Sequence, residues 1–186
     1  MKQLKLKAFY PHLFAIILLI LIGFIYFYPT LQGKVVNQSD VSSFVGAAKE
    51  TIDYRAANDG EEPLWTNSMF SGMPTTMIST YYKGNYLESI YEFLFVGPRP
   101  AADLILGFIS FYFLMLAFGV NPWLSIVGAL AFGLCSYNFQ IIQVGHNAKM
   151  TAIALMPAVL AALVYAFRKN RWLGAVLFGI TLSFEF

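Results

Sequence analysis

The chain carries little charge for its length. Only 12% of its 186 residues are Asp, Glu, Lys or Arg, whereas soluble proteins average about 25%. With so few charges and a hydrophobic fraction of 58%, the chain could not cover its surface in water, which indicates a membrane protein. The net charge of +2 is too small to argue for a nucleic-acid partner.

Cysteine and nucleotide-binding motifs are also scarce. The single cysteine, Cys135, excludes an intramolecular disulfide and a thiolate metal cluster. Because it lies inside an apolar run, we expect it to be a small buried residue. The sequence contains no Walker loop and no dinucleotide-binding glycine fingerprint, so ATP or NAD use is not expected from this portion.

Apolar runs dominate what remains. They predict five transmembrane segments, at residues 11–29, 101–120, 124–144, 151–167 and 172–186. The first follows a basic leader, residues 1–10, and lacks a small-residue cleavage site, which predicts an uncleaved anchor. The last is cut off in mid-run, so we expect the chain to be the N-terminal portion of a longer membrane protein.

Lysine and arginine placement predicts the orientation. The leader and the turn at 168–171 each carry three cations, which places both in the cytoplasm. Alternation of the spans then puts the turn at 121–123 inside, and the loop at 30–100 and the turn at 145–150 outside. That loop has eight acidic and five basic residues, so it lacks the cationic excess of a cytoplasmic loop. The prediction is an all-α polytopic membrane protein with a cytoplasmic N-terminus.

Loops beyond about 12–15 residues are usually either functional or disordered. The long external loop contains apolar residues at regular spacing, so we predict that it is structured and functional. An amphipathic helix along the membrane surface, at about residues 41–56, is predicted from apolar residues at helical spacing: Val41, Phe44, Val45, Ala48 and Ile52. Asp40 immediately precedes it, where an N-cap acceptor belongs.

Two short stretches carry candidate binding residues on the external side. The run NDGEEPLWTNSMFSGMPTT, residues 58–76, offers Glu62, Trp65 and Asn67; aromatic rings and amides suit a sugar, but the same residues would also suit a loop packed on its own helix.

The run GHNAKM offers His146, Asn147 and Lys149 at the start of the fourth span. Interfacial snorkelling explains the lysine but requires no histidine. A phosphate leaving group needs cations and N–H donors where charge develops, and a helix N-terminus adds its dipole. Both interpretations stay open.

Three runs carry a family resemblance: SDVSSFVGAAKETIDYR, EEPLWTNSMFSGMP and GVNPWLSIVGALAFGLCSYNFQIIQVGHNAKM. They resemble the N-terminal part of the YfhO family of bacterial membrane proteins, which is similar to the polytopic glycosyltransferases of the GT-C class. The resemblance covers nearly the whole chain. It implies a GT-C-like helix bundle in the bacterial cytoplasmic membrane that moves a sugar from a polyprenyl-phosphate donor to a cell-envelope acceptor at the outer face.

The resemblance also implies roles for residues. An acidic residue in the first external loop acts near the acceptor, and Asp40 matches that position as the catalytic base, with Glu61 and Glu62 as alternatives. We expect Asp40, His146 and Lys149 to converge on one external cavity beneath residues 58–76, with about 5–10 Å between the carboxylate and the cations by analogy with paired-carboxylate sites. The predicted substrate-binding residues are His146, Asn147, Lys149, Trp65, Asn67 and Glu62.

No cofactor is certain, and a divalent cation stays open. The expected partners are the lipid-linked donor, the acceptor and membrane lipid, with no nucleic acid. The alternative is a non-enzymatic transporter or flippase component, or a structural subunit, in which the same residues contact lipid headgroups.

Overall fold

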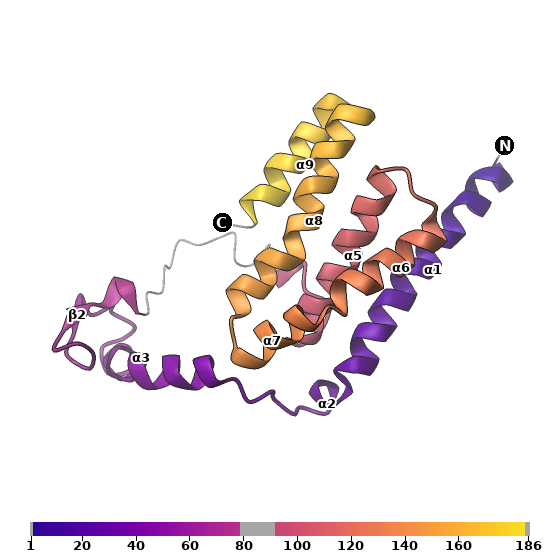
Figure 1. The fold of residues 1–186 in the computed structure, drawn as a ribbon. Coiled ribbons are helices and arrows are strands. Elements are labelled where there is room, and N and C mark those ends of the chain that lie inside the picture. The colour runs from indigo at the N-terminus through magenta and orange to yellow at the C-terminus, as the bar shows by residue number, and fades with distance from the viewer. Residues whose placement is uncertain (1, 79–91, 185–186) are drawn as a thin grey trace.

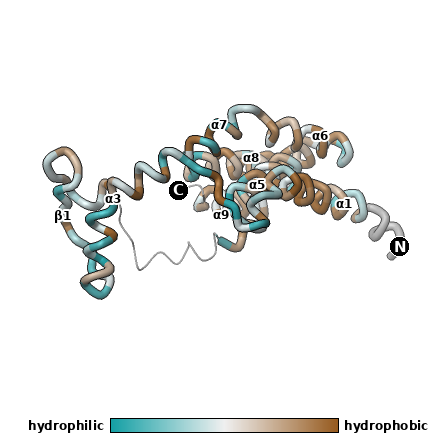
Figure 2. Tube along the Cα trace, turned by 90° about the horizontal axis from the view of Figure 1, so that it is seen from below, coloured by the Kyte–Doolittle hydropathy of each residue, from teal (hydrophilic) through white to brown (hydrophobic). Residues whose placement is uncertain are grey.

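The computed structural model describes residues 2–78 and 92–184, and this part of the chain is mostly helical. Figure 1 shows a helix bundle from which one segment, residues 28–78, extends sideways; we call it the external segment because it lies outside the bundle. The bundle contains α1 (Lys2–Tyr26), α5 (Ala101–Ala117), α6 (Pro122–Gly133), α7 (Ser136–Val144), α8 (Asn147–Arg168) and α9 (Arg171–Ser183). The predicted helical character is thus confirmed. Hydrophobic residues are concentrated in these helices (Figure 2).

Two of these helices are long and apolar enough to cross a membrane, namely α1, over Phe9–Tyr26, and α8. A third span exists if α6 and α7 count as one, although they are bent by 44° at their junction. The segments predicted at 101–120 and 172–186 contain α5 and α9, which are apolar but shorter. The 17 residues of α5 extend about 25 Å at 1.5 Å per residue, less than the roughly 30 Å of a hydrocarbon core.

The segment 124–144, predicted as one continuous span, is divided between α6 and α7. The Asn138 side chain explains the break, because its amide donates hydrogen bonds to the carbonyls of Phe132 (3.0 Å) and Gly133 (3.1 Å) at the end of α6. These bonds satisfy carbonyls that a continuous helix would otherwise pair. The bend also corrects the prediction for Cys135, which lies at the N-cap of α7 and is exposed rather than buried.

Asparagines set the short turns of the bundle. Asn121 accepts a hydrogen bond from the Trp123 amide and Asn170 accepts from the Trp172 amide, at the N-caps of α6 and α9. Asparagine is a preferred N-cap residue because its side chain satisfies an otherwise unpaired helix N–H. The turns predicted at 121–123 and 168–171 therefore coincide with real helix boundaries.

The bundle core forms where α5 packs against α1, α6 and α8. One cluster of buried side chains joins α1, α5 and α6: Ala15, Leu19, Leu104, Phe108, Tyr112, Ile126 and Ala129. Close approach needs small residues, since a Cβ on Gly133 would overlap the Phe108 ring. A polar contact also lies here, with His12 Nδ1 2.8 Å from the Tyr112 hydroxyl.

The external segment begins with α2 (Tyr28–Leu31) and continues into α3 (Ser39–Ala57). This helix confirms the one predicted at about residues 41–56. It could be predicted because its apolar residues recur at helical spacing. Beyond it come β1 (Trp65–Thr66), which pairs antiparallel with β2 (Met73–Pro74), and the 3-10 helix η1 (Thr75–Met77). The sequence did not predict this hairpin, since strands of two residues leave no alternation to detect.

Candidate functional site

The candidate site lies where the start of α3 meets the turn between α7 and α8. Gly145 ends α7 in the left-handed conformation, with φ of 102°, which is the usual glycine helix terminator. The amides of Gly145 and His146 both bond back to the Ile141 carbonyl. The chain therefore reverses within two residues, and His146 becomes the N-cap residue of α8.

Gln38, the N-cap residue of α3, fastens the two segments together. Its Nε2 donates to the Ile142 carbonyl (2.6 Å) and to Asn147 Oδ1 (3.1 Å), while Asn147 Nδ2 donates to Gln38 Oε1 (3.3 Å). A paired amide contact of this kind fixes orientation as well as distance, because donors and acceptors must match on both sides. The Asn147 side chain therefore holds the start of α3 against the start of α8.

Asp40 and His146 meet directly. His146 Nε2 lies 2.9 Å from Asp40 Oδ2, and the two side chains are 47% and 51% exposed respectively. Asp40 lies inside the first turn of α3 rather than at its N-cap, so the predicted capping role is wrong. The helix begins at Ser39, two residues earlier than an Asp40 cap would require, and the Asp40 carboxylate pairs with His146 instead. An acid in the first turn is still favoured by the helix dipole.

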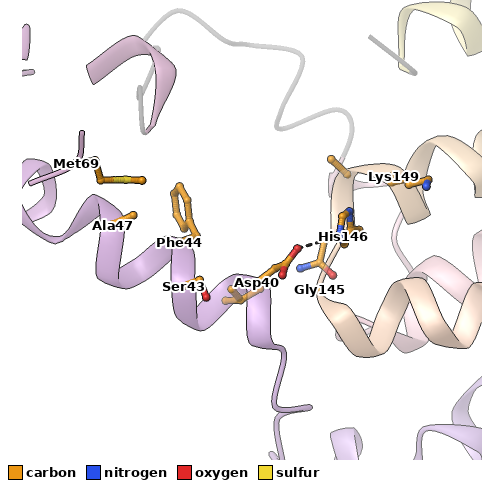
Figure 3. Close-up of a pocket in the computed structure, with 11 residues that line it drawn as sticks. Asp40, Ser43, Phe44, Ala47, Met69, Gly145, His146 and Lys149 are labelled. Carbon is orange, nitrogen blue, oxygen red and sulfur yellow. Dashed lines mark ion pairs between the residues drawn. The ribbon is translucent and has the colours of Figure 1, made fainter. Parts of the chain in front are cut away.

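A cavity of about 880 Å³ opens beside this pair. Figure 3 shows Asp40 directed at His146 from α3, with Phe44, Ala47 and Met69 farther along the same side. The wall is thus polar at the α8 end and apolar toward the hairpin. The lining residues are Asp40, Val41, Ser43, Phe44, Ala47, Met69, Gly145, His146, Asn147, Ala148 and Lys149. The structure therefore brings Asp40, His146 and Lys149 to the wall of one cavity.

Lys149 supplies a cation to the wall of the cavity. Its Nζ lies 5.3 Å from the centroid of the Tyr137 ring, and among the described residues no carboxylate forms an ion pair with it. In Figure 3 its side chain points away from Asp40. Lys149 also lies in the first turn of α8, where the unpaired N–H groups of the helix add positive potential.

The structure does not bring the other predicted residues into this cavity. Glu62 pairs with Arg55 at 3.0 Å, and the Trp65 ring packs against Gly72, where a Cβ would lie 2.7 Å from Trp65 Nε1. The Asn67 amide N–H donates to Glu50 Oε2 at 2.9 Å. Glu62 and the Asn67 backbone N–H thus attach this loop to α3, and Trp65 packs within the loop itself, in line with the alternative of a loop packed on its own helix.

Glu50 is the anchor of that contact. Its Oε2 accepts from the Thr66 hydroxyl at 2.6 Å as well as from the Asn67 amide. The hydrogen bond from Thr66, aided by backbone amides, lowers the pKa of the Glu50 carboxyl. The group therefore stays ionised and keeps accepting these bonds at neutral pH.

A buried acid supports the site from behind. Asp103, in the first turn of α5, is 1% exposed and its Oδ1 accepts a hydrogen bond from the Thr151 hydroxyl at 2.9 Å. Thr151 also lies 3.1 Å from the Asn147 carbonyl. This chain of contacts locates the first turn of α8, and with it His146 and Lys149, relative to the bundle.

Several lining residues were missed by the sequence prediction. Ser43, Ala47 and Met69 have side chains that give no chemical signal in the sequence. Gln38, which lies outside the cavity wall, was also missed because its role depends on a hydrogen bond to Asn147 on another helix. No three or more His, Cys, Asp or Glu side chains of the described residues are grouped to hold a metal ion. Asp40 and His146 alone would supply two ligands.

Replacing Gly145 with alanine should separate α3 from the turn. Alanine in a left-handed conformation costs about 1–2 kcal/mol, and its Cβ would lie 2.9 Å from the Gln38 Cβ. We expect a lower melting temperature and faster proteolysis within residues 34–38. Gly46→Ala is the matched control, because nothing lies within 4 Å of that position and alanine favours a helix by about 0.5–1 kcal/mol. Equal stability of the two variants would contradict the proposed contact.

Comparison of the chain with protein-family models, curated proteins and solved structures found no match.

Proposed function

We propose that the protein is a GT-C-like glycosyltransferase of the bacterial cytoplasmic membrane. It would transfer a sugar from a polyprenyl-phosphate donor to a cell-envelope acceptor at the outer face. One observation carries the proposal: Asp40 and His146, from segments far apart in the chain, form a 2.9 Å pair at the wall of a cavity that Lys149 also lines. A base and a phosphate-binding cation are the two groups this reaction needs.

The reaction proceeds by displacement with inversion. The acceptor hydroxyl oxygen attacks the anomeric carbon and forms the new glycosidic bond. The bond from that carbon to the phosphate oxygen breaks, and the polyprenyl phosphate leaves with the electron pair. The hydroxyl proton passes to the Asp40 carboxylate, which acts as general base. Among the described residues, only His146 contacts that carboxylate, through Oδ2, which leaves Oδ1 for the acceptor.

His146 takes a different role from the one the sequence suggested. A sugar phosphate cannot lie between two groups 2.9 Å apart, so the 5–10 Å separation expected for a phosphate-binding histidine does not apply. With its Nε2 protonated, His146 instead donates to Asp40 and fixes the direction of the carboxylate. Lys149 is then the residue that binds the phosphate. Its flexible four-carbon stem lets the ammonium turn from the Tyr137 ring toward the cavity.

The apolar part of the cavity suits the lipid portion of the donor. Phe44, Ala47 and Met69 form this part of the wall, next to the polar end at α8. A volume of about 880 Å³ lies within the range of about 300–1,000 Å³ typical of small-molecule sites. Turnover by the Asp40→Asn variant of the full-length protein tests the proposal.

The second candidate is a transporter or flippase component. The bend of 44° between α6 and α7 favours it, because interrupted helices often line substrate paths in transporters. The two functions differ in one measurement. A flippase moves labelled lipid across a proteoliposome without forming a glycosidic bond, whereas a transferase forms a new glycoside from a donor supplied on one side.

The proposed orientation places the site outside and the turn at 168–171 in the cytoplasm. In a Cys135→Ala background, Glu61→Cys should label with an impermeant thiol reagent added to intact cells, and Lys169→Cys should label only after the membrane is opened. Both positions are exposed. Lys169 is the C-cap residue of α8, but its cap hydrogen bond comes from the backbone N–H, which a cysteine keeps. The reverse labelling pattern would place Asp40 in the cytoplasm and remove the outer-face reaction.

A further inference from the structure

One stretch of the external segment, residues 63–78, carries no acidic or basic residue and no histidine. It contains β1, β2 and η1, and we name it the external hairpin. Its neighbours on α3 are charged, and Lys49 and Asp53 form an exposed ion pair there. Charge thus lies on the helix and in the turn that follows it, at Asp59, Glu61 and Glu62, and is absent from residues 63–78.

The hairpin exposes large apolar side chains. Leu64 and Phe70 are each 84% exposed, Met77 is 73% exposed and Trp65 is 55% exposed. Isolated exposed apolar residues are ordinary, but a group of them on a small element marks an interaction surface. The surface is uncharged as well as apolar, so its partner does not recognise it through ion pairs.

The tip of the hairpin is built to present Phe70. Phe70 and Ser71 have φ angles of 50° and 62°, followed by Gly72 at 116°. Bulky residues rarely adopt this left-handed conformation. The Gly72 amide bonds to the Met69 carbonyl at 2.8 Å, and the Trp65 ring covers Gly72. These contacts close a tight turn whose largest side chain faces outward.

The position of the hairpin identifies the partner. In Figure 1, α8 rises from the level of α3, and the hairpin, labelled β2, lies on that same upper side of α3. Figure 2, from below, places the hairpin to the side of the bundle. Lipid surrounds α1 and α8 if they cross a membrane, as their length and composition allow. The hairpin therefore lies beside the spans, where the edge of the surrounding bilayer would be.

We propose that the external hairpin inserts Phe70 and its neighbouring apolar side chains into the outer leaflet of the membrane that the bundle spans. Trp65 suits this depth because tryptophan prefers the interface between water and hydrocarbon. The charged ion pair of α3 stays in water. The proposal rests on the membrane location of the bundle and does not depend on a glycosyl-transfer reaction.

Spin labels measure this insertion directly. In the full-length protein with Cys135→Ala, a nitroxide is attached to Phe70→Cys, and the protein is placed in nanodiscs of phosphatidylethanolamine and phosphatidylglycerol. Oxygen concentrates in the bilayer and a nickel chelate stays in water, so their relaxation effects on the label report its surroundings. The control is Glu61→Cys, which lies two residues before the hairpin and is exposed.

We expect the label at position 70 to have a several-fold higher ratio of oxygen to nickel accessibility than the label at position 61. Equal ratios would place the hairpin in water and overturn the proposal. Protection from both reagents would also overturn it, in favour of a protein partner or a second copy of the chain. If Phe70→Cys fails to fold, Met77→Cys carries the same test. The measurement needs no substrate, so its failure is distinct from failure of the proposed reaction.

Discussion

The Asp40→Asn variant of the full-length protein is expected to lose about two to four orders of magnitude in kcat, the usual contribution of a general base. Asparagine keeps the shape of the side chain and still accepts a hydrogen bond from His146 Nε2. It cannot take the proton of the acceptor hydroxyl. Because Asp40 does not cap α3, only its interaction with the helix dipole is lost, worth about 0.3–1 kcal/mol. Expression and melting temperature should therefore change little.

Asp53→Asn is the matched control for this loss. Asp53 lies on the same helix, is exposed and pairs only with Lys49 at 2.8 Å among the described residues. Exposed pairs of this kind contribute about 0–1 kcal/mol, so this variant should keep full turnover. If Asp40→Asn also keeps full turnover, the carboxylate is not the base and the Asp40–His146 pair is a structural contact between α3 and α8.

His146 distinguishes the transferase from a flippase in the same arrangement. An orienting histidine acts through Asp40, so its loss should reduce kcat more than donor affinity. A histidine that contacts lipid headgroups would instead affect affinity. Since Nε2 lies 2.9 Å from Asp40 Oδ2, the structure supports the orienting role.

Patterns that repeat along the chain were predictable, and contacts between distant residues were largely not. The helix α3 was visible because apolar residues recur once per turn over several turns. Cation placement and span parity predicted the same side of a membrane for Asp40 and His146, and the two side chains meet in the structure. Their direct contact depends on Gln38 and Asn147, whose amides form a pair only in three dimensions.

The two clearest differences from the sequence prediction have local causes. An apolar run from 124 to 144 looks continuous, yet one buried amide, Asn138, ends α6 by bonding its last carbonyls. The aromatic and amide residues of the external hairpin resembled a sugar site, yet Glu50 draws Thr66 and the Asn67 amide onto α3. In both cases a polar side chain makes hydrogen bonds that a hydropathy pattern does not report.

The hairpin and the cavity share the upper side of α3, which has a consequence for substrate access. Met69, next to Phe70 in the hairpin, lines the cavity that Asp40 and His146 also line. If the hairpin lies in the outer leaflet, a lipid-borne donor can approach the cavity from within the bilayer. Its phosphate then meets the polar end at α8, where Lys149 and the helix N-terminus provide positive potential.

Lys149→Met is accordingly expected to weaken donor binding. Methionine keeps much of the apolar stem and removes the ammonium, so the phosphate loses a charged hydrogen bond worth about 1.5–3 kcal/mol. At 1.4 kcal/mol per tenfold change, the Kd for the polyprenyl-phosphate donor should rise about ten- to a hundredfold. Binding of a polyprenol without phosphate should be unchanged. Lys49→Met, on the exposed side of α3, is the control and should leave both affinities as they are.

Salt dependence separates this effect from a change in fold. An exposed lysine interacts with phosphate through a field that is screened over about 8–10 Å at physiological ionic strength. Wild-type affinity for the donor should therefore fall as salt is raised from low to physiological concentration, and the affinity of Lys149→Met should fall less. A variant that binds the phosphorylated donor as tightly as wild type, with the same salt dependence, would mean that the phosphate does not lie at the N-terminus of α8.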